Sequence, residues 1–207
     1  MESNEREYMR EVFQNQLSDV QGRLVEMAES VTTIMEKASK AFLNSDVALA
    51  DEAIALAEAN ENRALALDEI VIRVLAKQSP VARDLRILVS ALRISASLER
   101  MGALAGHIAA IARYRYPGTA VPEALRDTFL EMGRLDVELG RRVTTLLKNT
   151  DVNLAREIQA EDARVDDRPT REQQRGREVA VDPTEPFGLA EQVEAEGVLG
   201  IDQRLRL

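Results

Sequence analysis

Cysteine is absent from the 207-residue sequence, and histidine occurs once, at His107. Without cysteine there can be no disulfide framework, thiolate metal site or cysteine nucleophile. A single histidine excludes metal sites built from two or three imidazoles, including HExxH zinc sites and ferritin-like centres with paired ExxH motifs. No nucleophile–base arrangement is evident around this single histidine, and the sequence has no GxxxxGK[ST] loop to hold a nucleotide phosphate. These absences predict a protein that is not an enzyme.

Tryptophan is also absent, aromatic residues make up 3 % of the chain, and the net charge is −9. Base stacking on aromatic side chains and binding to a phosphate backbone are therefore not expected, so nucleic acid is excluded as a partner. No run of 18 apolar residues occurs, and the polar, acidic start MESNEREYMR is not a signal peptide. We expect a cytoplasmic protein that reaches a membrane only through its partners.

Apolar residues are spaced three and four apart over most of the chain, which is the spacing of one stripe on a helix. Turn and cap residues interrupt this spacing at 44–46, 79–80, 116–118 and 149–151. The sequence therefore predicts five helices, and the third carries two neighbouring apolar stripes, as a helix wedged between two others would. The predicted helices cover about 13–42, 47–78, 80–114, 122–148 and 152–167.

An internal repeat relates residues 44–52 to residues 149–157 at an offset of 105. Both segments read Asn-Ser/Thr-Asp-Val, followed by Leu-Ala and Glu, and the same offset carries Met27 onto Met132 and Ile34 onto Leu139. Two similar helical hairpins predict an all-α fold of two tandem three-helix bundles. The first bundle would occupy residues 1–117.

The second bundle is predicted to be incomplete. Residues 118–167 supply its first two helices, whereas the tail at 168–207 is polar at first, carries three prolines by residue 186 and is only weakly periodic. A missing third helix would leave apolar stripes exposed on the other two. Because large exposed apolar patches tend to find partners, we expect self-association as a homodimer, or a loosely packed second half.

Acidic residues at helical spacing are the candidate metal ligands. Asp162 and Asp166 are four apart, so both can face one cation. The repeat offset leaves Glu61 as their surviving counterpart, and Glu99 lies on a stripe otherwise built from Leu, Ser and Gly. The alternative is that these carboxylates are solvated or ion-paired, and that His107 is an ordinary helical histidine.

Residues 75–113 resemble the PhoU family of bacterial phosphate-transport regulators. The matching elements are Gln78, Pro80-Val81-Ala82, Asp84-Leu85-Arg86, Glu99-Arg100-Met101-Gly102 and His107-Ile108-Ala109. The later segments RYRYP and EMGRLDVEL are similar to the actinobacterial branch. The resemblance covers about residues 8–167 and ends there, so the terminus is divergent, frameshifted or eroded.

This resemblance implies two three-helix bundles related by an approximate two-fold, and an adaptor rather than an enzyme. Its expected partners are the ATPase of the phosphate ABC transporter and the phosphate-sensing histidine kinase, through which it would repress the phosphate-starvation response. Some members bind metal clusters through [DE]xxxD motifs. Alternatives are a metal-binding helical bundle with no regulatory role, or a function lost through the altered terminus.

Only part of that metal pattern is kept in this sequence, because Ala57 and Ala103 replace acidic positions of the first bundle. The ligands that remain for a divalent or iron cation are Glu61, Glu99, Asp162 and Asp166.

Overall fold

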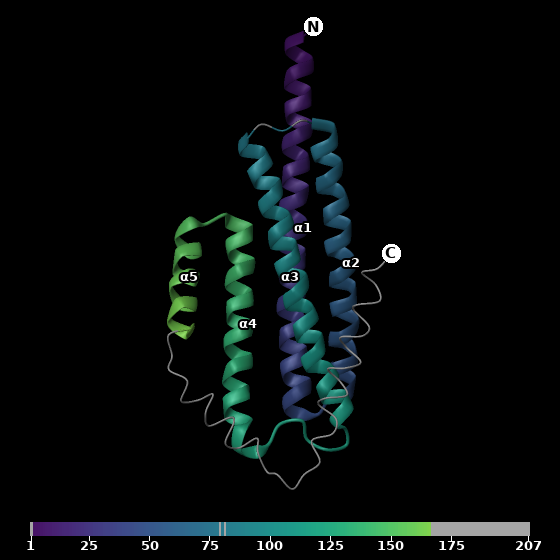
Figure 1. Ribbon diagram of the computed structural model, residues 1–207, viewed down its shortest axis with the longest axis vertical. Coiled ribbons are helices and arrows are strands. Elements are labelled where there is room, and N and C mark those ends of the chain that lie inside the picture. Colours follow the sequence, from purple (N-terminus) through teal and green to yellow (C-terminus); the bar gives the residue numbers. More distant parts are fainter. Residues whose placement is uncertain (1, 79, 81, 167–207) are drawn as a thin grey trace. The chain divides into compact units, whose positions relative to one another are not determined.

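The computed structural model describes residues 2–78, 80 and 82–166, without the side chains of residues 2–7, 9, 78 and 162–166. Nearly all of these residues are helical (Figure 1). The described part of the chain contains no strand, which confirms the predicted all-α class and the five predicted helices. The elements are α1 (Glu2–Asn44), α2 (Val47–Gln78), α3 (Ala82–Arg115), the 3-10 turn η1 (Glu123–Leu125), α4 (Arg126–Asn149) and α5 (Val152–Asp166).

Helices α1, α2 and α3 each pack against the other two and enclose the main core. In the half of the bundle nearer the start of α1, the core is built from large side chains such as Met27, Leu67 and Leu88, which are all fully buried. Around Ile34 the other buried residues of the core are all alanines, whose small side chains allow three helices to approach closely. These alanines are Ala38, Ala41, Ala50, Ala53, Ala105, Ala109 and Ala112.

The buried face of α3 takes residues from both predicted apolar stripes. Leu88 comes from one stripe and Leu98 from the other, and both are buried. At about 100° per residue, the outer members of the two stripes point away from the bundle axis. Leu85, Ile87 and Ile108 accordingly remain exposed. The helix packs against both α1 and α2 as predicted, but several of its apolar side chains are left outside that contact.

A buried asparagine connects α2 to α3. The side chain of Asn60 is fully buried, and its Nδ2 donates a hydrogen bond to the backbone oxygen of Leu98 at 3.3 Å. Gly102 makes room for it, because a Cβ at that position would lie 3.0 Å from Asn60 Nδ2. A polar side chain at a seam position favours one helix register over its neighbours, so Asn60 fixes how α2 meets α3.

The two copies of the sequence repeat form the same turn. Ser45 and Thr150 both have left-handed backbone conformations, with φ of 52° and 51°. In the first copy, Asp46 Oδ1 accepts a hydrogen bond from the Leu49 amide at 3.1 Å. In the second, Asp151 Oδ1 accepts one from the Leu154 amide at 3.3 Å. The α1–α2 and α4–α5 connections are therefore equivalent in structure as well as in sequence.

Helix α4 packs along α1 through small residues. Its buried face consists of Gly133, Val137, Gly140 and Thr144. A Cβ added to Gly133 would lie 2.9 Å from the Cβ of Ser39, which real Cβ atoms do not tolerate. The two helices are thus as close as their backbones permit, and glycine is needed for this approach.

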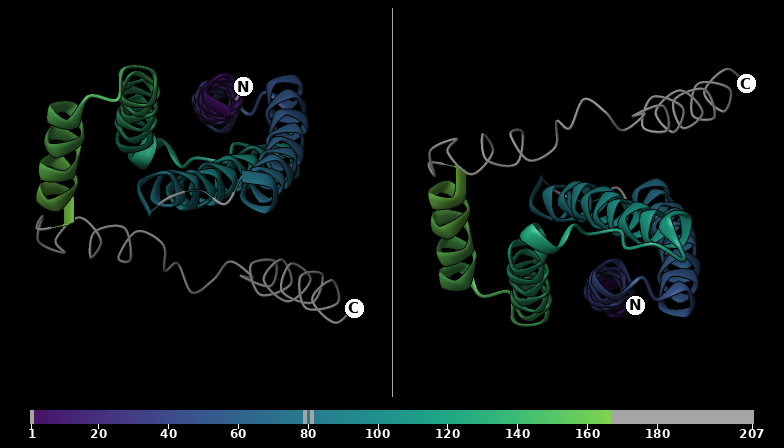
Figure 2. Two further views of the ribbon diagram at one scale, coloured as in Figure 1. Left: turned by 90° about the horizontal axis from the view of Figure 1, so that it is seen from above. Right: turned by 90° about the horizontal axis from the view of Figure 1, so that it is seen from below.

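Polar contacts fix α4 antiparallel to α1 at both ends. Arg126 Nη1 donates to the backbone oxygen of Leu43 at 2.6 Å near the start of α4. Near its end, Lys148 Nζ and Glu29 Oε1 lie 2.5 Å apart. Figure 2 shows α4 beside α1, and α4 packs along no other described α-helix.

Residues 1–160 form one compact unit, which contains α1 to α4 and the first part of α5. The predicted domain boundaries at residues 117 and 167 stay a prediction. The predicted irregular tail at 168–207 lies outside the described residues.

Candidate functional site

A groove of about 720 Å³ lies between α1, α3 and the α4–α5 turn. It exists because α4 packs along α1 but does not reach α3, so that a valley remains between α3 and α4. Its apolar lining consists of Leu17, Val20 and Leu24 from α1, Ile87, Ala91 and Ile94 from α3, and Leu146, Leu147, Val152 and Ala155 from α4 and α5.

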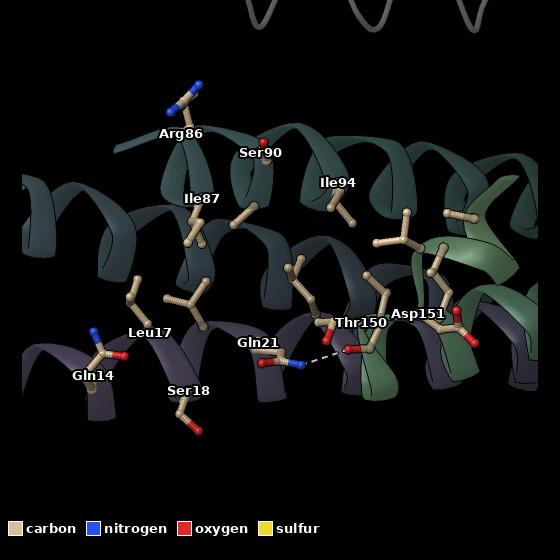
Figure 3. A pocket seen from close by; sticks show the side chains of 17 residues that line it. Gln14, Leu17, Ser18, Gln21, Arg86, Ile87, Ser90, Ile94, Thr150 and Asp151 are labelled. Atoms are coloured by element: carbon tan, nitrogen blue, oxygen red, sulfur yellow. Dashed lines mark hydrogen bonds between the residues drawn. The ribbon is translucent and has the colours of Figure 1, made fainter. Parts of the chain in front are cut away.

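Polar side chains of the groove lie at its rim. Figure 3 shows Leu17, Ile87 and Ile94 pointing between α1 and α3, with Arg86 and Ser90 on the outer side of α3. Gln21 Nε2 donates to the backbone oxygen of Leu147 at 2.9 Å and so ties α1 to the end of α4 (Figure 3). An apolar floor with a polar rim is the usual arrangement of a surface that binds a protein segment.

An exposed apolar stripe extends the groove along α4. The α4 stripe consists of Met132, Leu135, Leu139, Val143 and Leu146. Met132, Leu139 and Leu146 are seven residues apart, about two helical turns, and therefore lie on the same side of α4. Of these residues, Leu146 also lines the groove. Met132 and Leu139 remain 51 % and 37 % exposed, which confirms the predicted exposure of this stripe.

Asp136 is the one charged residue in a heptad series of α4, which consists of Phe129, Met132, Asp136, Leu139, Val143 and Leu146. Partial burial raises the pKa of its carboxyl above the ordinary range, because water solvates the charged form less well there. Elsewhere on α4, Arg134 makes ion pairs with Glu131 and Glu138 at 2.8 and 3.1 Å. The hydrogen bond from Arg134 lowers the pKa of Glu131. Charge on α4 is therefore concentrated away from the stripe.

The candidate metal ligands belong to α2, α3 and α5. Glu61 is exposed on α2, and Glu99 is half-buried on α3. Asp162 and Asp166 belong to α5, but their side chains lie outside the described residues. Within those residues no group of three or more His, Cys, Asp or Glu side chains is placed to hold a metal ion. The metal site accordingly stays a prediction.

The start of α3 presents a charged surface beside the groove. Arg83, Leu85 and Arg86 are exposed, and Arg86 also lines the groove. None of these three side chains is used in the core, so they are available to a partner. His107 is exposed farther along the same helix.

Sequence reasoning missed the groove and the glycine face of α4. The groove depends on α4 packing along α1 but not α3, which no local pattern encodes. The glycine face did leave a signal, because Gly133, Gly140 and Thr144 follow helical spacing as small residues.

No described helix is both long and apolar enough to cross a membrane.

Comparison with known proteins points to one family. The family model described as "PhoU domain" matches residues 24–112, from α1 to the end of α3. The phosphate-specific transport system accessory protein PhoU homolog 2 of Mycobacterium tuberculosis is 41 % identical over 159 residues, 77 % of this chain and 75 % of the relative. PhoU homolog 1 of Mycobacterium leprae is 38 % identical over 159 residues, 77 % of this chain and 72 % of the relative.

A more distant relative from Xylella fastidiosa, also named as a PhoU homolog, is 28 % identical over 156 residues, 74 % of this chain and 64 % of the relative. Identity near 40 % over about three quarters of both chains, together with a helical fold that matches the expectation, identifies the family that the sequence motifs indicated. The chain is a member of the PhoU family.

Proposed function

We propose that this chain is a non-catalytic regulatory adaptor of phosphate uptake. The observation that carries the proposal is the 41 % identity over 159 residues to a protein named as an accessory protein of the phosphate-specific transport system. In finer detail, the adaptor acts in the cytoplasm as a homodimer, contacts the ATPase of the phosphate ABC transporter and the phosphate-sensing histidine kinase, and represses the phosphate-starvation response.

The surface beside the groove supports a binding role. Arg83 and Arg86 are exposed at the start of α3, next to the exposed Leu85 and the apolar groove. Arginine combined with exposed apolar side chains is typical of protein–protein contacts, and it needs no catalytic group. We therefore assign partner binding to this end of α3.

Complementation tests the proposal. In a strain that lacks its own PhoU proteins and carries a phosphate-starvation reporter, expression of this chain should restore repression in phosphate-rich medium. The double variant Arg83→Glu and Arg86→Glu should lose most of that repression while remaining folded and present at the same level. A reporter that stays on with the unaltered, well-expressed chain would refute the adaptor function and favour the alternative that this chain has lost that function.

A matched control separates surface recognition from general charge. Arg73 and Lys77 are exposed on α2, away from the groove lining. The double variant Arg73→Glu and Lys77→Glu changes the net charge by the same amount and should leave repression intact. Equal loss of repression in both double variants would contradict the assignment to the start of α3.

A further inference from the structure

A row of basic side chains follows one side of α3. Arg86, Arg93, Arg100 and His107 are each seven residues apart, and all four are exposed. Residues seven apart on a straight α-helix differ by only about 20° in direction, so these side chains form one row. At 1.5 Å per residue the row is about 31 Å long. Its first member, Arg86, also lines the groove.

The three arginines of this row have no acidic partner on their own helix. The usual partner of an exposed helical arginine is a carboxylate three or four residues away. At those distances from Arg86, Arg93 and Arg100 the sequence has no aspartate or glutamate. In the part of the chain that the structure describes, none of the three makes an ion pair.

Arginines elsewhere in the molecule show the usual arrangement. Arg23 pairs with Asp19 of the same helix at 3.1 Å, and Arg113 of α3 pairs with Asp51 of α2 at 3.2 Å. The basic row differs because its unpaired arginines recur at a fixed spacing and begin at the groove. It is a local surplus of positive charge in a chain whose net charge is −9.

An apolar row lies directly beside the basic row. Ile87, Ile94, Met101 and Ile108 have the same spacing of seven, and each follows a basic residue. Ile87 and Ile94 line the groove and point between α1 and α3 (Figure 3). Ile94 and Met101 are half-buried, whereas Ile87 and Ile108 are 44 % and 39 % exposed. An apolar row flanked by charges at this spacing is the pattern by which one helix packs along another.

The groove leaves positive charge for a ligand. Its charged lining residues are Arg86 and Asp151. Asp151 Oδ1 accepts hydrogen bonds from the amides of Asn153 and Leu154 at 2.9 and 3.3 Å, so this carboxylate already caps α5. Arg86 Nε donates to the backbone oxygen of Ala82 in its own helix at 3.2 Å, and this bond neutralises no charge. A ligand that fits the groove should therefore be apolar on one side and negatively charged beside it.

We propose that the α3 seam, which consists of the basic row and the apolar row, binds an amphipathic helix of a partner protein. The apolar side of that helix enters the groove at Ile87 and Ile94 and continues along α3. Its aspartates or glutamates recur every seven residues and lie opposite the three arginines, and such flanking charges determine which partner helix is accepted. The proposal rests on the partner binding of the proposed function and adds the chemistry of the partner.

Fluorescence polarisation with a labelled synthetic peptide and the full chain tests the proposal. The acidic peptide has about four heptads, with isoleucine and leucine at the seam positions and glutamate on both sides of them. It should bind with a dissociation constant on the order of 10 μM, and more weakly as salt rises, because salt screens exposed charge pairs. A scrambled peptide keeps the charge but loses the apolar row, and should bind at least about tenfold more weakly.

Charge reversal identifies the basic row. The double variant Arg93→Glu and Arg100→Glu should bind the acidic peptide at least about tenfold more weakly, because two attractive charge pairs become repulsive. The same variant should bind a peptide with lysine in place of glutamate better than the unaltered chain does, which also shows that it is folded. The matched control, Arg73→Glu and Lys77→Glu, changes two exposed residues of α2 by the same charge. It should keep its affinity for the acidic peptide.

A second pair of variants examines the apolar row. Ile87→Ser removes an exposed apolar side chain from the groove, and should weaken binding of the acidic peptide by roughly three- to tenfold. Leu65→Ser is its control, since Leu65 is 60 % exposed on α2 and does not line the groove. This control should bind like the unaltered chain.

Three results would overturn the proposal. The first is no binding of the acidic peptide at chain concentrations up to about 200 μM, which is also expected if a second copy of the chain fills the groove. The second is equal binding of the scrambled peptide, which would indicate attraction to any anion. The third is an equal loss of affinity in both double variants.

The reporter assay keeps this proposal separate from the adaptor function. A chain that represses the reporter but does not bind the acidic peptide would keep the adaptor function and lose only the α3 seam. A chain that binds the peptide through Arg93 and Arg100 but does not repress would refute the adaptor function alone.

Discussion

Met27 and Met132 hold equivalent positions in the two copies of the repeat, but their surroundings differ. Met27 is completely buried, whereas Met132 is 51 % exposed, and the pair Ile34 and Leu139 shows the same contrast at 0 % and 37 %. The local sequence produces the same helix, the same stripe and the same aspartate cap in both copies. The difference comes from α2 and α3, which both pack on α1, whereas among the described α-helices α4 packs only along α1. A helical stripe specifies which face is apolar, and only the packing of other helices determines whether that face is buried.

Truncating the equivalent residues Ile34 and Leu139 tests this contrast directly and should give the largest change in the free energy of unfolding. Ile34→Ala leaves a cavity in a closed core and should lower the free energy of unfolding by about 2–5 kcal/mol. Leu139→Ala removes a side chain that still meets water, and should cost less than about 1 kcal/mol. Urea unfolding of both variants and of the unaltered chain measures the two losses. Equal losses would mean that the second hairpin is covered as well as the first.

The helices could be predicted from the sequence because each depends on contacts within a few residues. Heptad spacing located α1 and α2, and the aspartates that cap α2 and α5 were identified from their place in the repeat. The sequence could not predict which apolar stripe would remain exposed to solvent. Ile87 and Leu88 are adjacent apolar residues on α3, yet one lines the groove and the other is buried in the core. Leu88 is buried because α3 packs on α1 and α2, and Ile87 lines the groove because α4 packs along α1 but not along α3. Both are long-range properties.

The close approach of α4 to α1 gives the next largest prediction. Gly133→Ala places a methyl group against Ser39 and should destabilise the α1–α4 contact by about 1–3 kcal/mol, even after a gain of up to about 1 kcal/mol in helix propensity. The added variant Ser39→Gly should recover part of the loss, because it removes the Cβ that clashes. A double-mutant cycle in urea measures this coupling.

Gly22→Ala is the control for that experiment. Gly22 lies in α1, and nothing lies within 4 Å of a Cβ built there. The substitution should therefore stabilise the chain by up to about 1 kcal/mol through helix propensity alone. If Gly133→Ala were as stabilising as Gly22→Ala, the α1–α4 contact would be looser than the structure indicates.

The equivalent aspartate caps should behave unequally. Asp46→Ala should lower global stability by about 1 kcal/mol, because α2 is part of the closed core and its end cannot unwind independently. Asp151→Ala removes the same kind of cap from α5, which packs less tightly, so its effect should be confined to that helix. Amide hydrogen exchange followed residue by residue distinguishes a global from a local loss. Equal global losses would place α5 in the same cooperative unit as α2.

The candidate site could be predicted less well than the fold. Glu61 and Glu99 were chosen for their spacing and for their place in the family pattern, but spacing within one helix does not determine what the neighbouring helices bring near. In the described part of the chain, no third ligand-type side chain joins them in a cluster. Exposed residues such as Arg83 and Arg86 were visible in the sequence as part of a motif. Their place beside a groove required the packing of α1, α3 and α4.

The smallest expected effect on the free energy of unfolding concerns Asp136, a charged residue beside the apolar stripe of α4. Partial burial raises its pKa in the folded chain above the unfolded value. A raised carboxyl pKa means that the folded state gains stability when the group is protonated. This contribution is fully present below the unfolded pKa and is lost as the pH rises through the folded pKa.

Asp136→Asn should therefore stabilise the chain at pH 7 by a fraction of about 1 kcal/mol, since solvent still screens this group. The advantage should disappear below about pH 3, under the ordinary Asp pKa of about 3.9, where Asp136 is protonated in both states. Urea unfolding of the variant and the unaltered chain at both pH values tests this, and an advantage that persists at low pH would show that the carboxylate is not its source.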